Sequence, residues 1–213
     1  MTPRLLILGA GTFAVQTLEI AEQAGGFEPV GFINSVEVPA ADARLEGLPV
    51  YGIEALPFAP GEVLIVSGAV SNRRRAAIEI LAQRGYGFAT LVHPTAYVSR
   101  RAKLAAGAVV NSGVQLSIYV ELGPHAIVNR GAAVGHHTQV GAYATIGPGV
   151  TIAGDVQIGA GAYIGVGSVI REKSTIGAGA VVGAGAVVVK PVAANTLVTG
   201  VPASVMRTGV DGL

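Results

Sequence analysis

The sequence contains no cysteine and no tryptophan among its 213 residues, and only 5% of its residues are aromatic. The absence of cysteine excludes disulfides, thiolate metal ligands and a cysteine nucleophile, and it fits a cytoplasmic location. Charged residues are also scarce, at 13%, against roughly 25% in an ordinary soluble domain. A net charge of +1 offers no basic surface for nucleic acid, so we expect no nucleic-acid partner.

Long uninterrupted apolar runs are missing as well, although the mean hydropathy is +0.57. A membrane-spanning helix needs about 20 consecutive apolar residues. The most apolar run, residues 176–189, is shorter and is interrupted by four glycines. The apolar stretch near the start ends already at Gly9 and does not have the length of a signal peptide. We therefore expect neither a membrane span nor an export signal.

What the sequence does contain is a strict repeat. An aliphatic residue occurs at every sixth position from Val98 to Val188, in sixteen of sixteen positions. The next residue is often glycine, and the residue four positions later is always alanine, serine, threonine or valine. This period of six is the hexapeptide signature of a parallel β-helix.

The geometry of such a helix explains the unusual composition. Short strands turn a corner every six residues, and three strands close one coil of eighteen residues. The aliphatic residues fill a narrow interior, and glycine allows the backbone to bend and to stack closely. Because the frame is never interrupted, any site must consist of corner and outward-facing side chains. Exposed flat faces of small apolar residues favour association, so we predict a homotrimer.

The composition changes near His93-Pro94. Residues 1–97 hold fifteen of the 27 charged residues, whereas residues 98–188 hold nine. We therefore predict an N-terminal domain at 1–93, a β-helix at 94–190 and a C-terminal tail at 191–213.

The N-terminal segment alternates strands and helices. Strands are predicted at residues 4–8, 30–33, 63–66 and 90–92, a first helix is predicted to end at Gly25-Gly26, and a second helix to run from about Ser71 to Arg84. This alternation predicts a small α/β domain with a Rossmann-like parallel sheet.

The turn after the first strand matches the dinucleotide-binding pattern as Gly9-x-Gly11-x-x-Ala14. In that pattern, backbone amides at a helix N-terminus face phosphate. An NAD site usually has an acidic residue after the second strand, where this sequence has Asn34 and Ser35. Three interpretations remain open: a phosphate or nucleotide-sugar contact, an NAD site, or a purely structural turn.

A run of three arginines, Arg73-Arg74-Arg75, lies at the predicted start of the second helix. It is either a phosphate clamp or a solvated helix face, and the sequence does not separate the two.

Two of the four histidines are candidate catalytic residues. His136 and His137 lie two and three positions after an interior aliphatic residue, so their phase predicts that both face outward. A histidine exchanges protons near neutral pH and suits general-base work on an amine or hydroxyl. His125 lies on another face, and His93 is predicted to be structural. Asp155 follows His137 by one coil, so its carboxylate is predicted to stack beside His137 and could orient an imidazole. The spacing does not predict three converging metal ligands within one chain, so no metal is expected.

Several segments together resemble a known family. Residues 128–137, with the following Val140-Gly141, resemble the bacterial sugar O-acyltransferases of the sialic-acid O-acetyltransferase type, closest to their nucleotide-4-aminosugar N-acetyltransferases. Residues 91–96 resemble the family's inter-domain linker, and residues 200–203 its closing motif. The resemblance implies left-handed coils, an acetyl-CoA donor, a trimer with CoA between adjacent β-helices, and an acceptor held partly by the N-terminal domain.

The resemblance also implies roles for individual residues. His136 corresponds to the catalytic base, with His137 beside it. The implied nucleotide-sugar contacts are Gly11, Thr12, Phe13, Asn34, Ser35 and Gly68. The implied acetyl-CoA contacts are Thr145, Val166 and Ala184.

The sequence departs from the family at three positions. His137 stands where an acidic residue often follows the catalytic histidine, Thr145 replaces a second histidine, and Asn34 replaces an acidic residue. The leading hypothesis is an acetyl-CoA-dependent N-acetyltransferase of a nucleotide-linked 4-amino-dideoxy sugar in surface glycan synthesis. The alternatives are sugar O-acetylation by the same base and a non-catalytic β-helix trimer.

Overall fold

The computed structural model describes residues 2–72 and 74–212. The chain divides into two compact units, Met1–His93 and Pro94–Leu213, and each has its own hydrophobic core. Neither of the helices in the described residues is long and apolar enough to cross a membrane.

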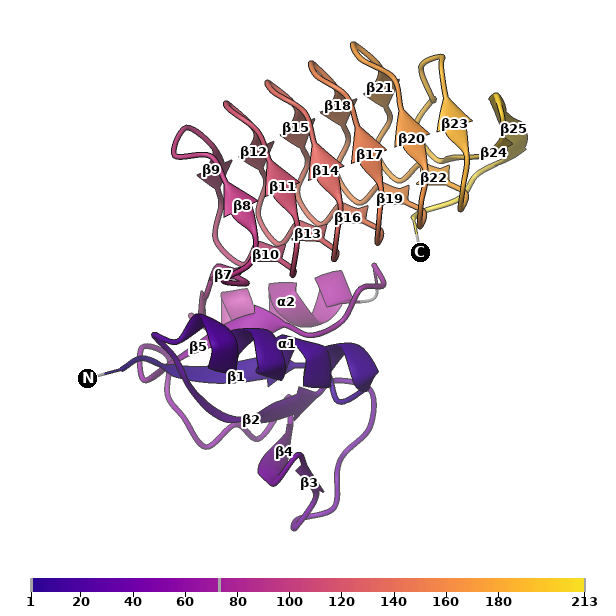
Figure 1. Cartoon of the computed structure of the whole chain (residues 1–213). Coiled ribbons are helices and arrows are strands. Elements are labelled where there is room, and N and C mark those ends of the chain that lie inside the picture. Colours follow the sequence, from indigo (N-terminus) through magenta and orange to yellow (C-terminus); the bar gives the residue numbers. More distant parts are fainter. Residues whose placement is uncertain (1, 73, 213) are drawn as a thin grey trace. The chain divides into compact units, whose positions relative to one another are not determined.

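A six-stranded sheet forms the centre of the first unit (Figure 1), in the strand order β3-β4-β2-β1-β5-β6. Its central strands pair in parallel, as the alternation of strands and helices predicts. The strands are β1 (Arg4–Leu8), β2 (Glu28–Asn34), β3 (Arg44–Leu45), β4 (Leu48–Gly52), β5 (Val63–Ser67), β6 (Gly87–Phe88) and, beyond this sheet, β7 (Leu91–Val92); the helices are α1 (Thr12–Ala24) and α2 (Arg74–Gln83).

The predicted Rossmann-like domain is found only in part. The described residues of this unit contain two helices, and the sheet is mixed because β3 and β4 pair antiparallel. Glu46 and Gly47 form the two-residue turn between these strands, with φ of 48° and 76°, which suits a tight hairpin. Sequence periodicity missed this edge because β3 has two residues and β4 contains Pro49.

Close backbone packing explains the small residues after β1. A Cβ on Gly68, after β5, would lie 2.7 Å from the Cα of Ala14 in α1. A Cβ on Gly9 would lie 2.8 Å from the Gly68 carbonyl oxygen, and Gly9 has φ of +125°. Gly9, Gly68 and Ala14 therefore let the ends of β1 and β5 meet the start of α1 without side chains between them, whereas a Cβ on Gly11 would meet no atom within 4 Å.

The second unit is a parallel β-helix of hexapeptide repeats. Its short strands form three sheets, one from β22, β19, β16, β13 and β10, one from β23, β20, β17, β14, β11 and β8, and one from β21, β18, β15, β12 and β9. The strands are β8 (Tyr97–Val98), β9 (Lys103–Leu104), β10 (Val109–Val110), β11 (Gln115–Leu116), β12 (Glu121–Leu122), β13 (Ile127–Val128), β14 (Ala133–Val134), β15 (Gln139–Val140), β16 (Thr145–Ile146), β17 (Thr151–Ile152), β18 (Gln157–Ile158), β19 (Tyr163–Ile164), β20 (Val169–Ile170), β21 (Thr175–Ile176), β22 (Val181–Val182) and β23 (Val187–Val188).

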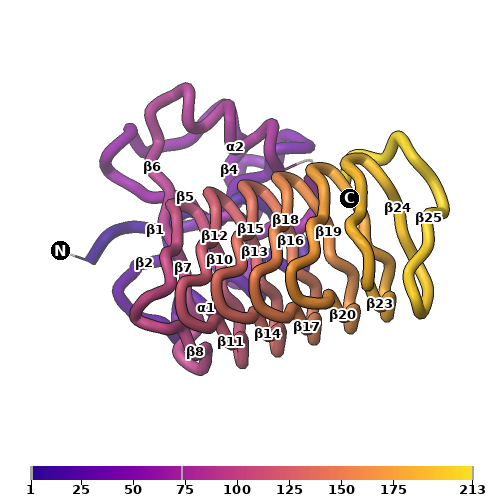
Figure 2. The backbone as a smooth tube through the Cα atoms, turned by 90° about the horizontal axis from the view of Figure 1, so that it is seen from above, coloured from indigo at the N-terminus to yellow at the C-terminus, as the bar shows by residue number. Residues whose placement is uncertain are grey.

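The strand register agrees with the predicted coil of eighteen residues. Leu116 pairs with Val134, and Val134 pairs with Ile152. These aliphatic side chains are at most 2% exposed, so they form the interior of the prism. Figure 2 shows the coils stacked in succession along its axis.

One corner of the coil has residues other than glycine in the left-handed backbone conformation. Tyr119, His137, Asp155 and Lys173 follow one another at intervals of eighteen residues, with φ of 60°, 59°, 58° and 56°. Backbone hydrogen bonds tie the successive corners together, since the Asp155 amide donates to the His136 carbonyl at 2.8 Å. The fold therefore stacks His137 directly between Tyr119 and Asp155 along this corner.

The segment predicted as a C-terminal tail is structured. Strand β24 (Thr196–Gly200) continues the β22 sheet in parallel, and β25 (Ala203–Thr208) folds back on it antiparallel. The turn between these two strands contains a cis Val201–Pro202 bond.

Candidate active site

The first unit contains a cavity of about 740 Å³ where β1, β2 and β5 end. This size falls within the usual range of small-molecule sites. The turn after β1 and the start of α2 provide polar groups along its wall, while Val36, Ile53, Val70 and Ile80 provide apolar surface. The cavity can therefore hold a ligand that has both an anionic and an apolar part.

The cavity brings together most of the predicted nucleotide-sugar contacts. Its lining includes Gly11, Phe13, Asn34, Ser35 and Gly68. Thr12, the first residue of helix α1, is exposed and is not among the lining residues.

The Asn34 side chain is engaged in its own loop. Its Oδ1 accepts hydrogen bonds from the amides of Val36 and Glu37, at 3.0 and 3.2 Å. An asparagine therefore has a structural task here, because it closes the turn after β2 with an acceptor oxygen.

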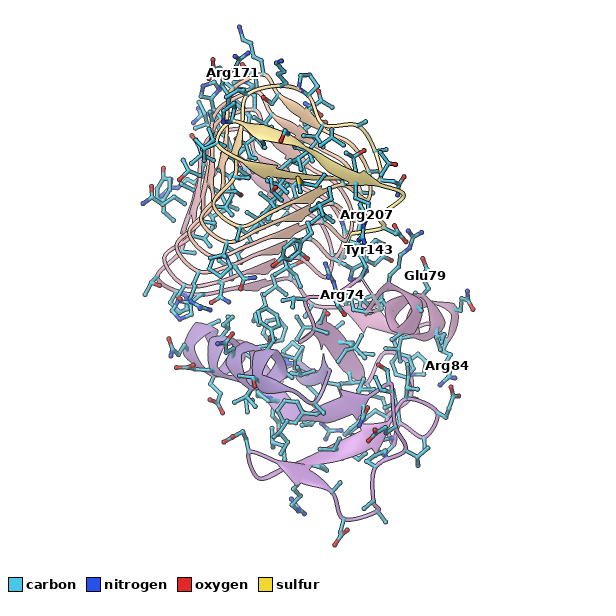
Figure 3. The ribbon with its side chains drawn as sticks, turned by 90° about the vertical axis from the view of Figure 1, so that its right-hand side faces the viewer. Arg74, Glu79, Arg84, Tyr143, Arg171 and Arg207 are labelled. Carbon is cyan, nitrogen blue, oxygen red and sulfur yellow. The ribbon has the colours of Figure 1, made fainter. Side chains whose placement is uncertain are left out.

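The structure separates the members of the arginine run. Arg74 lines the cavity and is only 3% exposed, which corrects the solvated-face interpretation for this residue. Its Nη1 donates to the Val70 and Ser71 carbonyl oxygens, and Figure 3 labels its position. Arg75 is exposed and pairs with Glu79 at 2.8 Å on the surface of α2. Arg73 lies outside the described residues.

Arg74 is the clearest cavity residue that the family resemblance missed, although the arginine run had marked it as a phosphate clamp candidate. A buried guanidinium held by two carbonyl oxygens is oriented before any ligand arrives. Such a group is suited to bind phosphate, because its planar fork offers several N–H donors.

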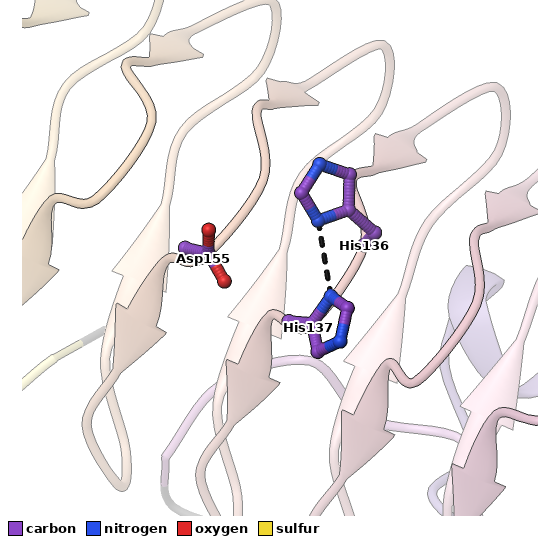
Figure 4. A group of neighbouring side chains, drawn as sticks. All are labelled: His136, His137 and Asp155. Carbon is purple, nitrogen blue, oxygen red and sulfur yellow. Dashed lines mark hydrogen bonds between the residues drawn. The ribbon is translucent and has the colours of Figure 1, made fainter.

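His136 and His137 are both exposed on one corner of the β-helix, as their phase predicts. Their Nδ1 atoms are 3.1 Å apart, so one imidazole donates a hydrogen bond to the other (Figure 4). The ring of His137 also contacts that of Tyr119, with centroids 4.9 Å apart. The corner therefore orients His137, which in turn orients His136.

The ring of His136 lies over the next coil at Gly154. A Cβ at Gly154 would be 2.5 Å from both Cε1 and Nε2 of His136. Glycine at this position therefore leaves the space that the imidazole occupies.

The carboxylate of Asp155 completes a cluster with the two histidines. One ligand atom from each of His136, His137 and Asp155 lies within 4.8 Å of the others, and all three residues are exposed. The sequence spacing predicted that Asp155 stacks beside His137, but it did not predict that ligand atoms of all three residues come this close. The eighteen-residue coil stacks residue 155 beside residue 137, so residues distant in sequence meet on one corner.

The predicted acetyl-CoA contacts lie on other parts of the coil. Val166 follows β19 and Ala184 follows β22, and both are exposed, whereas Thr145 in β16 is only 2% exposed. Gly185 donates to the Val166 carbonyl at 2.9 Å, which stacks the turns of Val166 and Ala184. Within one chain this corner is separate from that of His136, which follows β14.

A second cavity of about 440 Å³ lies on the outer face of β9, β12, β15 and β18. Lys103 and Glu121 line this cavity, and Nζ of Lys103 lies 2.8 Å from Oε1 of Glu121. The hydrogen bond from this ammonium to Glu121 raises the pKa of Lys103 above its usual value.

The remaining histidines are buried. His93 is 8% exposed and His125 is 7% exposed, and the His125 ring stacks on Tyr143 at 5.1 Å. The burial of both histidines and the stacking of His125 on Tyr143 agree with structural roles.

Residues 155–190 match the family described as bacterial transferase hexapeptide, six repeats. No curated protein sequence matches this chain.

Solved structures resemble nearly the whole chain. The acetyltransferase domain of PglB from Neisseria gonorrhoeae, in complex with acetyl coenzyme A, is 31% identical, with 97% of this chain and 100% of that chain covered and a TM-score of 0.87. PerB from Caulobacter crescentus, in complex with CoA and GDP-perosamine, is 29% identical, with coverage of 97% and 99% and a TM-score of 0.82. WeeI from Acinetobacter baumannii shares the fold at 24% identity, with coverage of 96% and 100% and a TM-score of 0.84.

Proposed function

This chain belongs to the bacterial hexapeptide transferases and is an acetyl-CoA-dependent acetyltransferase, and we propose that it acetylates the amine of a nucleotide-linked 4-amino-dideoxy sugar. The process proposed for this reaction is surface glycan synthesis. The observation that carries the proposal is the exposed His136, whose Nδ1 contacts His137 while its Nε2 is not engaged in that contact.

His136 acts as the general base in this proposal. The amine of the sugar attacks the thioester carbonyl carbon of acetyl-CoA and forms the new C–N bond. Nε2 of His136 takes the proton that the amine loses. The C–S bond then breaks, and the proton passes to the departing CoA sulfur, so that no acyl-enzyme forms.

The contact with His137 is compatible with the tautomer that this role needs, because either imidazole can be the donor in it. Nε2 of His136 can accept a proton only when its Nδ1 carries the ring hydrogen and donates it to Nδ1 of His137. Once Nε2 is protonated, this hydrogen bond has a charged donor and becomes stronger. A neutral His137 therefore supplies the acceptor, although it lacks the negative charge of a carboxylate.

The cavity of the first unit is proposed to bind the nucleotide part of the acceptor. Amides at the start of α1 and the guanidinium of Arg74 face the phosphates, as helix N-termini and arginines commonly do. Gly11, Phe13, Asn34, Ser35 and Gly68 line the same cavity, which supports this part of the proposal. Thr12 is proposed to contribute only its backbone.

Acetyl-CoA is proposed to bind between adjacent chains of a homotrimer with left-handed coils. In one chain, Val166 and Ala184 lie on a different corner from His136. A neighbouring chain can provide the second wall of the acetyl-CoA site. The corner with Val166 and Ala184 in one chain then faces His136 of its neighbour. PerB was crystallised with both CoA and GDP-perosamine, which supports two substrates bound together.

The test is acetyl transfer by the purified protein with acetyl-CoA and a panel of UDP-, GDP- and dTDP-linked amino and hydroxy sugars. We expect CoA release with amino sugars only. Release with hydroxy sugars would instead support O-acetylation. No release with any acceptor, together with no acetyl-CoA binding, would leave the non-catalytic β-helix trimer as the better description.

Replacing Arg74 with methionine should raise the KM for the nucleotide sugar by about 10–100-fold, since hydrogen bonds to charged groups contribute ~1.5–3 kcal/mol. The KM for acetyl-CoA should not change, because the cavity belongs to the first unit, whereas acetyl-CoA is proposed to bind to the β-helix of the second unit. Steady-state kinetics with each substrate varied in turn measures both constants.

The matched control is Arg75→Met, which removes the neighbouring exposed arginine and its pair with Glu79. It should leave both KM values within about twofold, as expected for an exposed ion pair. An equal rise in KM for the two arginine variants would argue against a phosphate contact by Arg74.

Replacing Gly154 with alanine should displace the His136 ring, because the new methyl group would overlap Cε1 and Nε2. A misplacement of about 1 Å at a reacting group can cost ~10²-fold in rate, so we expect kcat to fall by up to that factor. The same change in a His136→Ala background should have no further effect on kcat. A similar loss in both backgrounds would mean that Gly154 acts independently of the imidazole.

A further inference from the structure

We propose that His136, His137 and Asp155 form a binding site for a divalent transition metal ion, with Zn²⁺ as the fitting ion. Two imidazole nitrogens and one carboxylate are a common ligand set for Zn²⁺ in proteins. The three ligand atoms already lie within 4.8 Å of one another. No other group of three such residues is found among residues 2–72 and 74–212.

The distance between the two imidazoles fits a shared ion. Two nitrogens bound at ~2.0–2.1 Å to a tetrahedral Zn²⁺ are about 3.3 Å apart, and the two Nδ1 atoms are 3.1 Å apart. To complete the site, the exposed Asp155 side chain has to bring its carboxylate closer, and the two rings have to turn so that both Nδ1 lone pairs point at the ion. The three residues leave the fourth position open to water, since the corner faces solvent.

The backbone holds the ligands close together before an ion arrives. His137 and Asp155 occupy consecutive left-handed corners, and the Asp155 amide donates to the His136 carbonyl at 2.8 Å. Among the described ion pairs, none engages Asp155. Lys173 occupies the next corner of the same column and is the cation nearest to Asp155 along it.

The ion and a proton compete for the same two nitrogens. Without metal, one hydrogen lies between the Nδ1 atoms; with metal, both Nδ1 lone pairs are donated to the ion. A metal-bound Nδ1 leaves the ring hydrogen of neutral His136 on Nε2, which then has no lone pair to accept a proton. Metal binding therefore inhibits acetyl transfer, a consequence that rests on the proposed function, whereas the binding itself does not.

Binding is tested with Co²⁺ as a spectroscopic probe on the untagged, substrate-free protein. We expect visible d–d absorption that saturates at one Co²⁺ per chain, is displaced by Zn²⁺ and weakens as the pH falls. Mutating a residue that only hydrogen-bonds to a metal ligand already lowers metal affinity ~10–100-fold. Asp155→Asn replaces a proposed ligand itself and should therefore weaken Co²⁺ binding at least about tenfold. The matched control is Glu172→Gln, which removes an exposed carboxylate of the same corner region and should leave the affinity unchanged.

Ring NMR signals locate the ion, because Zn²⁺ should shift those of His136 and His137 and spare those of His93 and His125. Equal Co²⁺ affinity in the wild type and Asp155→Asn, shifts at the buried histidines instead, or no binding at millimolar Co²⁺ would each overturn the site.

Inhibition is followed by the loss of thioester absorbance rather than by free thiol, because Zn²⁺ also binds thiols. We expect Zn²⁺ to inhibit acetyl transfer reversibly with EDTA, and Asp155→Asn to need at least about tenfold more Zn²⁺. A protein that binds Co²⁺ as described but acetylates no sugar would refute the proposed function and leave the metal site intact. An enzyme that acetylates the sugar but does not bind Co²⁺ would refute the metal site and leave the proposed function intact.

Discussion

Replacing His136 with alanine is expected to reduce kcat/KM for acetyl transfer by about 10²–10⁴-fold, the usual contribution of a general base. The loss follows from the removal of Nε2, the nitrogen that takes the proton from the attacking amine. CoA release with a reactive amino sugar measures the effect. Because His136 is exposed on a corner of the coil, the variant should keep its thermal unfolding temperature and its acetyl-CoA affinity.

A pH profile separates the loss of a base from a general disturbance of the site. The residual activity of the His136→Ala variant should rise with pH as the free amine becomes more abundant, without the inflection that the enzyme's base contributes. Near-normal turnover by this variant would refute the assignment of His136.

Replacing Gly159 with alanine is expected to destabilise the β-helix by about 1–3 kcal/mol, the usual cost of overpacking. A Cβ at Gly159 would lie 2.3 Å from the backbone nitrogen of Ala178 and 2.7 Å from its Cα. These atoms belong to the next coil and cannot move without separating the stacked strands. The unfolding temperature should fall by ~2–12 °C, at about 2–4 °C per kcal/mol for a chain of this size.

Gly167→Asn is the matched control from the same repeat. Gly167 has φ of +66°, and a Cβ added to it would have no atom within 4 Å; asparagine tolerates this conformation. Asn195 already occupies a left-handed corner, with φ of 54°. The control should change stability by less than about 0.5 kcal/mol, as most surface substitutions do. Equal destabilisation by both variants would contradict the argument from coil spacing.

The repeat could be predicted from sequence because each of its residues meets the same local requirement. Val134, for example, must fill a narrow interior, and its neighbours must be small enough for the coil to turn. The outward direction of His136 followed from the same phase. The β3–β4 hairpin of the first unit could not be found this way, since two short strands with a proline have no periodic signal.

The cavity and the cluster of side chains needed the tertiary structure for a different reason. Arg74 belongs to an arginine run whose members looked equivalent in sequence, yet helix α2 turns Arg74 toward the cavity and Arg75 toward solvent. The eighteen-residue period already places Asp155 beside His137, whereas the approach of their ligand atoms and those of His136 to within 4.8 Å depends on side-chain direction.

The sequence by itself determined the β-helix, its eighteen-residue coil and the outward phase of the two adjacent histidines, because a strict period of six satisfies one local packing rule at every turn. Only the tertiary structure decided how closely those histidines meet their neighbours: the 3.1 Å contact between their Nδ1 atoms, the approach of the Asp155 carboxylate to within 4.8 Å, and the space over Gly154. Distances between side chains depend on backbone corners and rotamers, which a repeat pattern does not encode.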